Sequence, residues 1–381
     1  MSIIIGADLV PTKSNYTLFN NGNADELVGN DLLKILYDSD FRVFNLETPL
    51  TDAKTTIKKN GPALCTPRST ISGIKALRTD LLALANNHIM DQGTAGLYST
   101  FQLLDDNRIR YIGAGCDAEQ ALQPTVINVK GKKIGFYTCV EHEFSLAGSD
   151  TPGANPFDVF ESYDHIEKLK KTCDFVVVLY HGGKEYYRYP SPFLQRVCRK
   201  FVQSGADLVI CQHSHCIGCE EKYGNGTIVY GQGNFIFSDC FGPVQESSLL
   251  VNIKDDFSIE YIPLLKTRSG VRLAVEKQAE KILLDFRERS EQIKQVDFIQ
   301  KEYAKLARRN LNGYMLATSG YYHKFFQRFF NKLSGYRLTK FFGVGLYKER
   351  ELLAIRNYIE CESHRELWIW GLKGYNVNKS L

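Results

Sequence analysis

Short apolar runs, each long enough for one strand, recur along the first two thirds of the chain. These runs are residues 3–5, 41–44, 81–85, 175–180 and 208–210. Each is rich in residues that favour β-structure and carries no polar face, which is typical of strands buried on both faces. The sequence therefore predicts a sheet at the centre of a layered domain.

Between these runs lie stretches with the apolar spacing of helices. We expect helices at residues 25–37, 69–77, 94–107, 158–171 and 192–204. Strands that alternate with helices predict βαβ units and an α/β fold. Two hairpin-like pairs interrupt the alternation, 125–129 with 132–138 and 247–253 with 258–264, and the second pair is expected to close the domain. A mixed sheet, or two packed sheets, is therefore expected rather than a purely parallel one.

Each buried run leads into residues that commonly bind metals. In chain order they are Asp8; Asn45 and Glu47; Asn87 and His88 with Asp91; His181; and His213 with His215. Open α/β sheets bind their ligands beyond the carboxyl ends of the strands, so these residues are expected to converge. Carboxylate, amide oxygen and imidazole together form the ligand set of a hydrolytic divalent-metal site.

Composition agrees with a globular enzyme, since 44% of the residues are hydrophobic and 24% are charged. The net charge of +4 does not indicate bulk binding of polyanions, and no nucleic-acid partner is expected. Neither a leader-like start nor an apolar run long enough for a membrane span is evident, so a cytoplasmic protein is expected. From about Val271 the chain changes to dense alternating charge, which predicts a domain at 1–270 and a mainly helical extension at 271–381.

The order of several short phrases resembles one known family. The phrases are Gly6-Ala7-Asp8, Asn45-Leu46-Glu47, Ala85-Asn86-Asn87-His88, His181-Gly182-Gly183, Gly205-Ala206-Asp207, His213-Ser214-His215 and Gly233-Asn234-Phe235. Over residues 1–265 the chain resembles the CapA capsule-synthesis proteins (PgsA-type, poly-γ-glutamate biosynthesis). These proteins belong to the calcineurin-like metallophosphoesterase superfamily. Any one phrase is weak evidence, but all of them in one order are specific.

The resemblance implies a four-layer αββα metallophosphoesterase-like sandwich with a metal centre of one or two Mn, Fe or Zn ions. It implies that the metal ligands are Asp8, Glu47 as a bridging carboxylate, Asn87, His181, His213 and His215. It further implies that His88 protonates a leaving group. His213 and His215 would point to the same face of the chain if this segment were extended.

Other residues near the motifs allow two interpretations each. Asp91 either orients His88 and takes part in catalysis or caps a helix, and Glu185 either supports a ligand histidine or caps a helix. We expect Asn45, Glu185 and Tyr186 to line the substrate site, although Tyr186 fits a packed loop equally well. A polyanionic polymer or a phosphoester is the expected substrate.

Departures from the superfamily pattern leave two functional classes open. The usual Asp-x-His opening is missing because Leu9 and Val10 follow Asp8, while Gln212 and Ser214 replace a glycine and a proline. The first class is a metal-dependent hydrolase of a phosphoester or an amide, which the acid histidine favours. The second class is a non-catalytic binding or scaffold subunit for polymer synthesis or export, which the missing histidine favours.

The C-terminal extension contains one further pattern. Lys324, Arg328 and Lys332 recur every four residues among phenylalanines between Tyr321 and Gly335, which predicts an amphipathic helix. Such a helix either packs its aromatic side chains on the core or contacts a membrane surface or a membrane-bound polymer-synthesis complex. The second interpretation predicts a location peripheral to the membrane.

Overall fold

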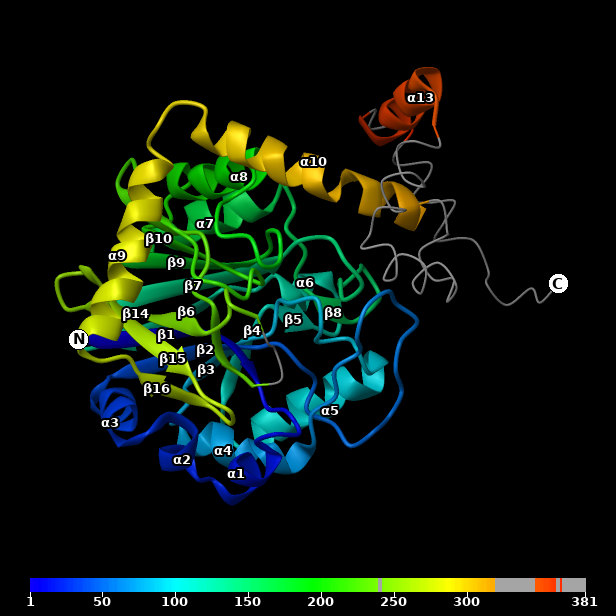
Figure 1. Cartoon of the computed structure of the whole chain (residues 1–381). Coiled ribbons are helices and arrows are strands. Elements are labelled where there is room, and N and C mark those ends of the chain that lie inside the picture. The colour runs from blue at the N-terminus through cyan, green and yellow to red at the C-terminus, as the bar shows by residue number, and fades with distance from the viewer. Residues whose placement is uncertain (239–241, 319–346, 361–363, 365–381) are drawn as a thin grey trace. The chain divides into compact units, whose positions relative to one another are not determined.

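A computed structural model describes residues 1–238, 242–318, 347–360 and 364 (Figure 1). The chain divides into two compact units, Met1–Ile299 and Gln300–Leu381. The first unit is a mixed α/β domain built on two sheets. The described helices of the C-terminal part are α10 (Phe298–Thr318) and α13 (Glu349–Glu360), so helices are present there as the sequence predicted.

The first sheet combines parallel strands with an antiparallel edge. Its path runs β16-β15-β14-β1-β2-β3-β4, and β13 also pairs with β1. The strands are β1 (Ser2–Val10), β2 (Phe41–Leu46), β3 (Leu81–Ala83), β4 (Arg110–Ile112), β13 (Asn234–Phe237), β14 (Ser247–Lys254), β15 (Ile259–Lys266) and β16 (Val271–Leu273). Strands β1 to β4 are parallel, so their carboxyl ends lie along one edge of the sheet.

The second sheet follows the path β11-β12-β10-β9-β7-β6. Its strands are β6 (Thr125–Val129), β7 (Lys132–Val140), β9 (Phe175–His181), β10 (Leu208–Gln212), β11 (Glu220–Tyr223) and β12 (Gly226–Val229). The central strands β7, β9, β10 and β12 are parallel. A short pair, β5 (Ala114–Gly115) and β8 (Gly153–Ala154), lies outside both sheets.

The two sheets pack face to face, because one apolar cluster contains residues of both. Ile5 and Val43 of the first sheet pack there with Val177 and Ile210 of the second. Strands buried on both faces explain why the sequence shows continuous apolar runs instead of alternation. The outer faces are covered by α1 (Tyr16–Asn21), α2 (Ala24–Val28), α3 (Asn30–Asp38), α4 (Ile71–Ala76) and α5 (Gly93–Asp106) on one side and by α7 (Ser162–Lys170) and α8 (Pro192–Gln203) on the other (Figure 1).

Local signals explain where the predicted helices begin and end. The single helix expected over 25–37 is divided into α2 and α3 at Gly29, whose φ of 78° interrupts the helix. The helix expected over 69–77 is a short 3₁₀ turn (Arg68–Thr70) followed by α4. Helix α8 begins where Ser191 accepts a hydrogen bond from the Leu194 amide, with proline at the first position. A short helix, α6 (Ala118–Ala121), was not expected.

The first compact unit extends beyond residue 270, the boundary expected from the sequence. Strand β16 adds to the edge of the first sheet next to β15, so the β14–β15 hairpin does not close the domain. Helix α9 (Glu276–Gln292) buries Phe286 in the apolar cluster between the sheets. Dense surface charge on α9 concealed this apolar contact, because only a narrow stripe of the helix faces the core.

The amphipathic segment Tyr321–Gly335 lies outside the described residues. Its packing and membrane interpretations therefore stay predictions. Among the described helices, none combines the length and the apolar character that crossing a bilayer requires.

Candidate metal centre

The candidate ligands meet where the parallel strands of the two sheets end. Asp8, near the end of β1, lies opposite Asn45 of β2, and Glu47 follows β2 directly. In the second sheet His181 closes β9, and His213 follows the neighbouring strand β10. The strand ends therefore bring together residues that are far apart in the sequence, as the apolar runs predicted.

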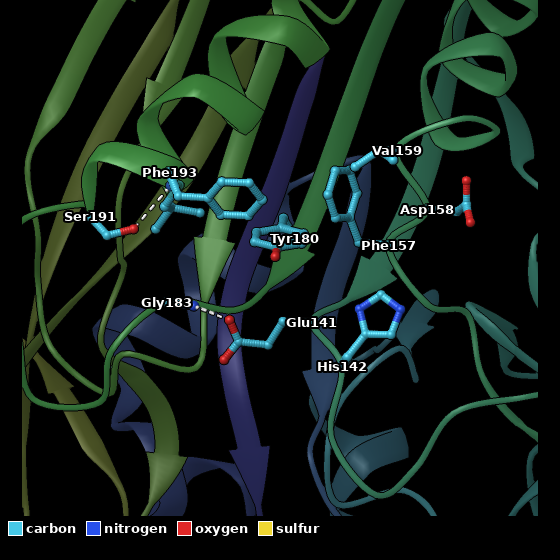
Figure 2. A pocket seen from close by; sticks show the side chains of 10 residues that line it. Glu141, His142, Phe157, Asp158, Val159, Tyr180, Gly183, Ser191 and Phe193 are labelled. Atoms are coloured by element: carbon cyan, nitrogen blue, oxygen red, sulfur yellow. Dashed lines mark hydrogen bonds between the residues drawn. The ribbon is translucent and has the colours of Figure 1, made fainter. Parts of the chain in front are cut away.

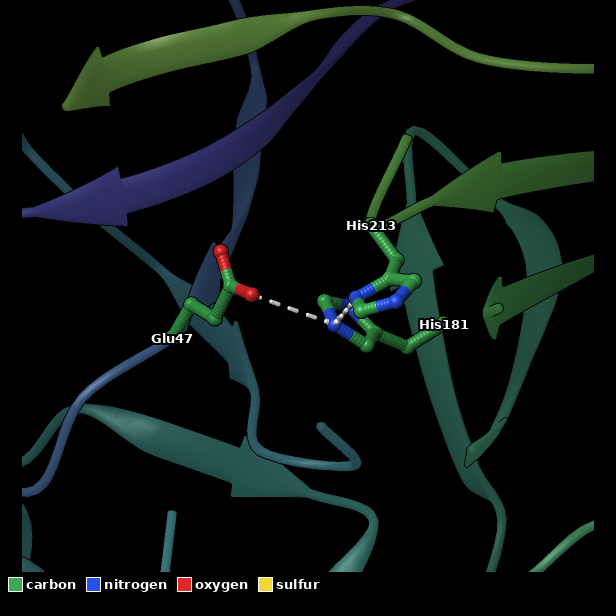
Figure 3. Close-up of side chains that lie close together, drawn as sticks. All are labelled: Glu47, His181 and His213. Atoms are coloured by element: carbon green, nitrogen blue, oxygen red, sulfur yellow. Dashed lines mark hydrogen bonds and ion pairs between the residues drawn. The ribbon is translucent and has the colours of Figure 1, made fainter. Parts of the chain in front are cut away.

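Glu47 belongs to two overlapping groups of possible ligands. One group is Glu47, His181 and His213, and the other is Asp8, Glu47 and His215; within each, one ligand atom per residue lies within 4.8 Å of the others. Oε1 of Glu47 is 3.3 Å from Nε2 of His181, and that nitrogen is 3.2 Å from Nδ1 of His213 (Figure 3). Glu47 thus occupies the place of a carboxylate shared between two neighbouring positions.

Three buried carboxylate oxygens in this cluster have no hydrogen-bond donor. They are Oδ2 of Asp8 and both oxygens of Glu47, which have no hydrogen-bond partner among the described residues. Both side chains are fully buried, and the contacts that these oxygens do make are ion pairs with histidines, 3.3 Å from Glu47 to His181 and 3.2 Å from Asp8 to His215. Carboxylate oxygens beside imidazole nitrogens are the donors that a divalent transition metal prefers, so the residues present fit such an ion.

Mutual charges shift the pKa values of the cluster in opposite directions. Burial raises the pKa of the Glu47 carboxyl, but the charges of His215 and His181 outweigh burial and hold this pKa well below its usual range. Burial lowers the pKa of His215, but the charges of Glu47 and Asp8 outweigh burial and raise it to about 10. For His213, burial and the charge of His181 both lower the pKa, which leaves a neutral imidazole suited to a metal.

The segment after β10 reaches the cluster through an unusual backbone. His213 and His215 have φ values of 80° and 53°, in the left-handed region that non-glycine residues rarely adopt. The segment is therefore not extended, so the condition under which both rings would share a face does not hold. The rings are nevertheless close, with centroids 5.9 Å apart, because the turn brings them together. Such backbone conformations cluster at functional sites.

His88 lies beside the cluster and is held by Asp91. Its Nδ1 atom is 2.5 Å from Oδ2 of Asp91, and its backbone amide donates to the Asn86 side chain. Asp91 is fully buried and also accepts hydrogen bonds from the Leu64 amide and from Nζ of Lys59. Since the Nδ1 proton is engaged with a carboxylate, Nε2 is the nitrogen left for chemistry.

The asparagines contribute in different ways. The Asn87 Oδ1 atom lies 3.0 Å from Nε2 of His181, which places an amide oxygen in the cluster. The Asn45 amide donates to Oδ1 of Asp8 at 2.8 Å and lies 3.2 Å from Nδ1 of His181. Asn45 is fully buried, so this arrangement gives it a positioning contact and offers no support for the expected contact with substrate. Oδ1 of Asn234, a residue of the Gly233-Asn234-Phe235 phrase, accepts a hydrogen bond from Nδ1 of His215 at 2.8 Å.

Glu185 and Tyr186 lie on the rim of the cluster. One carboxylate oxygen of Glu185 groups with ring nitrogens of His213 and His215 within 4.8 Å. Tyr186 is 51% exposed, and its ring centroid is 5.9 Å from that of His215. Their expected contacts with substrate stay predictions, and Glu185 fits a further metal ligand equally well.

A pocket of about 510 Å³ opens next to His213, on the side of the second sheet. Figure 2 shows Phe157, Tyr180 and Phe193 around it, with the Glu141 carboxylate bonded to the Gly183 amide at 3.0 Å. The other oxygen of Glu141 is 3.6 Å from Nε2 of His213. Glu141 therefore lies between the cluster and this pocket, since it lines the pocket and contacts His213.

Sequence reasoning missed two residues of this site. Glu141 directly follows β7, so the same rule of polar residues after apolar runs could have identified it. Lys59 lies in a segment without helix or strand, and it carries no pattern that distinguishes it from a surface lysine.

The part of the chain that carries this site is similar to known proteins. The family profile described as "Bacterial capsule synthesis protein PGA_cap" matches residues 3–239. The capsule biosynthesis protein CapA of Bacillus anthracis is 28% identical over 241 residues, which are 60% of this chain and 59% of that protein. The PGA biosynthesis protein CapA of Bacillus subtilis (strain 168) is 30% identical over 217 residues, 56% of this chain and 57% of that protein.

The chain thus matches less than two thirds of the length of these curated relatives. A 5'-nucleotidase precursor from Thermus thermophilus overlaps 76% of this chain and 58% of its own, with a TM-score of 0.41 and 15% identity, a likeness too limited to carry an argument. The family profile covers more than half of the sequence, and the chain therefore belongs to the bacterial capsule synthesis protein family PGA_cap.

Proposed function

We propose that this protein is a divalent-metal-dependent hydrolase that acts in the assembly of a capsule polymer. The observation that carries the proposal is the group of three donor-free buried carboxylate oxygens of Asp8 and Glu47 beside ligand-type histidines. Among the described residues, ion pairs with His181 and His215 offset the burial of these oxygens, and a bound divalent cation would neutralise both carboxylates directly. We propose Mn, Fe or Zn as the metal, in one or two positions.

The fold supports a metallophosphoesterase-like assignment. Two sheets packed face to face with helices outside correspond to the expected αββα sandwich. The candidate ligands lie beyond the carboxyl ends of parallel strands, where sheets of this class bind their ligands. The proposed metallophosphoesterase-like chemistry is supported by this arrangement together with the family membership.

The side chains have distinct proposed roles around the metal. Bound cations would polarise a substrate oxygen and lower the pKa of a water. Asp8, Glu47, Asn87, His181, His213 and His215 would hold them. Asn45 keeps Asp8 and His181 in place, as partners behind metal ligands commonly do. His88, with Nδ1 bonded to Asp91, would give a proton from Nε2 to the departing oxygen or nitrogen.

The substrate class is also a proposal. The relatives named above are proteins of capsule and PGA biosynthesis, and this chain shares about half of their length. We infer that the scissile bond is a phosphoester or an amide of a polyanionic polymer. A peripheral contact with a membrane-bound polymer-synthesis complex is part of the same proposal.

One observation favours a second function. Val10, which resembles the position of the missing imidazole ligand, is a buried apolar residue and cannot bind a metal. A site with fewer ligands would bind metal more weakly, and the protein would then serve as a binding or scaffold subunit for polymer assembly. The two functions differ in metal content and in turnover.

Metal analysis of the purified protein, combined with generic phosphomonoester, phosphodiester and amide assays, tests the proposal. We expect bound Mn, Fe or Zn after reconstitution, and we expect His213→Ala with His215→Ala to lose both metal and activity. His165→Ala is the control for loss of a histidine outside the cluster. His165 lies on the outer helix α7, where its ring stacks on that of Tyr137. Near-zero metal in the wild type, or equal metal in the double variant, would refute a metal centre. Bound metal without any turnover would favour the scaffold function.

A further inference from the structure

The pocket of Figure 2 combines aromatic walls with acidic side chains. Its volume is about 510 Å³, and the rings of Phe157, Tyr180 and Phe193 surround it. The other residues that line it are Glu141, His142, Asp158, Val159, Gly183, Ser191 and Leu194. Among the described residues that line the pocket there is no lysine or arginine, so no cation of the lining balances the charges of Glu141 and Asp158.

The walls of the pocket offer apolar surface to a ligand. Phe157 and Tyr180 are buried, and their rings meet edge to face with centroids 5.6 Å apart. Phe193, in the first turn of α8, is 59% exposed, and Val159 is 50% exposed. Exposed apolar side chains beside a cavity are typical of binding sites, and ring faces also attract cations.

The hydroxyl of Tyr180 is a polar group available to a ligand. Tyr180 is only 3% exposed, yet its hydroxyl forms no hydrogen bond with any residue that the structure describes. Figure 2 shows this hydroxyl on the side of Glu141. A Cβ atom on Gly182 would lie 2.9 Å from Cζ of Tyr180 and 2.9 Å from Oε2 of Glu141, so the phenol and the carboxylate meet at this glycine. Buried polar groups usually have a partner, and here a ligand would supply it.

The carboxylate of Glu141 has one oxygen engaged and one available. Its Oε2 atom accepts a hydrogen bond from the Gly183 amide at 3.0 Å. Its Oε1 atom is 3.6 Å from Nε2 of His213, which is longer than a hydrogen bond, so Oε1 keeps room for a donor. The exposed Glu143 and Lys184 act on Glu141 from outside the lining, with opposite charges.

We propose that this pocket binds an organic ammonium ion with an apolar body, and that the ammonium group lies between Oε1 of Glu141 and the hydroxyl of Tyr180. The three donors of an ammonium group suit two separate oxygens and a ring face. A guanidinium favours both oxygens of one carboxylate, but Oε2 is already bonded to Gly183. The inference goes beyond the proposed function and does not rest on it.

Isothermal titration calorimetry of the intact chain with phenethylamine tests the proposal. We expect saturable binding near neutral pH, where the amine is charged. Phenethyl alcohol, which has a similar shape without the charge, is expected to bind at least about tenfold more weakly. Hydrocinnamate, an anionic analogue, is expected not to bind. If the amine does not bind saturably, or if the amine and the alcohol bind equally, the proposal is wrong.

Two substitutions locate the bound amine. Tyr180→Phe is expected to weaken binding about three- to tenfold, because it removes one hydrogen bond, and Glu141→Gln about tenfold or more, because it removes the charge. The matched controls are Tyr163→Phe and Glu167→Gln, which should bind like the wild type. Tyr163 packs in the same apolar cluster as Tyr180, Glu167 is exposed on α7, and neither lines the pocket.

Thermal unfolding of each variant checks its fold, and Tyr180→Phe alone suffices if Glu141→Gln does not fold. Unchanged affinity in the folded pocket variants would place the amine elsewhere and overturn the proposal.

Two sources carry this ligand chemistry, a small free amine and a lysine side chain of a partner protein. Competition with acetyl-Phe-Lys-amide separates them. Displacement of phenethylamine by this peptide supports the site and assigns it to a partner's lysine, whereas binding of phenethylamine without displacement supports it as a site for a free amine. Neither turnover nor metal content is measured, so the result does not depend on the hydrolase proposal.

Discussion

Nζ of Lys59 lies 2.5 Å from Oδ1 of Asp91, and both side chains are buried, with 4% and 0% exposure. This ion pair connects segment 51–67 to the residue that holds His88. Neither charge can be screened by water, so each depends on the other.

Lys59→Met is therefore expected to lower the free energy of unfolding by about 3–5 kcal/mol, because it leaves the Asp91 carboxylate buried without its cation. Urea unfolding measures this loss. Lys281→Met is the control, since Lys281 is 75% exposed in a surface ion pair with Asp285. This substitution should lower the free energy of unfolding by less than ~1 kcal/mol. A similar small loss for Lys59→Met would mean that segment 51–67 is not held by this pair.

His88 and His181 are expected to respond differently to substitution. If His88 is a proton donor, His88→Asn lowers turnover about 10²–10⁴-fold while metal content stays near normal. His181→Ala removes a ligand and should lose metal and activity together. Metal content and turnover measured on the same preparations distinguish the two residues. Equal metal loss in both variants would make His88 a ligand.

Asn45→Ala tests a positioning role, since Asn45 donates to Asp8 and lies against His181 without reaching the surface. We expect metal affinity to fall about 10–100-fold, as for other partners of metal ligands. Competition with a fluorescent chelator measures the affinity. Asn225→Ala, at an exposed position between β11 and β12, is the control. Unchanged affinity with a raised KM would instead support contact with substrate.

Stability and metal binding should depend on pH in opposite ways. The pKa of His215 is raised from 6.5 to about 10 by Glu47 and Asp8, despite burial. In metal-free protein its contribution to stability is therefore fully present below pH 6.5 and is lost as pH rises through about 10. The pKa of Glu47 is lowered from 4.5, so its contribution to stability is present above pH 4.5 and is lost as the pH falls below that value.

Thermal unfolding of the metal-free protein should therefore show its highest Tm between about pH 4.5 and 6.5. His215→Asn should remove much of the decline above pH 6.5. Metal affinity should instead rise with pH, because the cation replaces a proton on His215. A Tm that increases from pH 6.5 to 10 in metal-free protein would contradict this ion-pair account.

Local patterns in the sequence were sufficient to identify most of the candidate ligands. Strands such as β1 and β9 are buried on both faces, so they appear as uninterrupted apolar runs, and the first polar residue after each run marks the strand end. Asp8 and His181 could be found in this way without any knowledge of the fold. The same runs led to Asn87 and to the His213–His215 pair; the family phrases implied the ligand roles, and the family profile confirmed the family.

Tertiary structure decided the features that depend on contacts between distant segments. Lys59 reaches Asp91 from a segment without regular structure, and helix α9 buries Phe286 through a narrow stripe on a charged surface. His213 and His215 converge through left-handed turns that local propensity disfavours. Asn45 of β2 contacts Asp8 of β1 and His181 of β9 because the ends of these three strands meet. In each case the stabilising free energy comes from a contact with a distant part of the chain, and no local sequence pattern encodes such a contact.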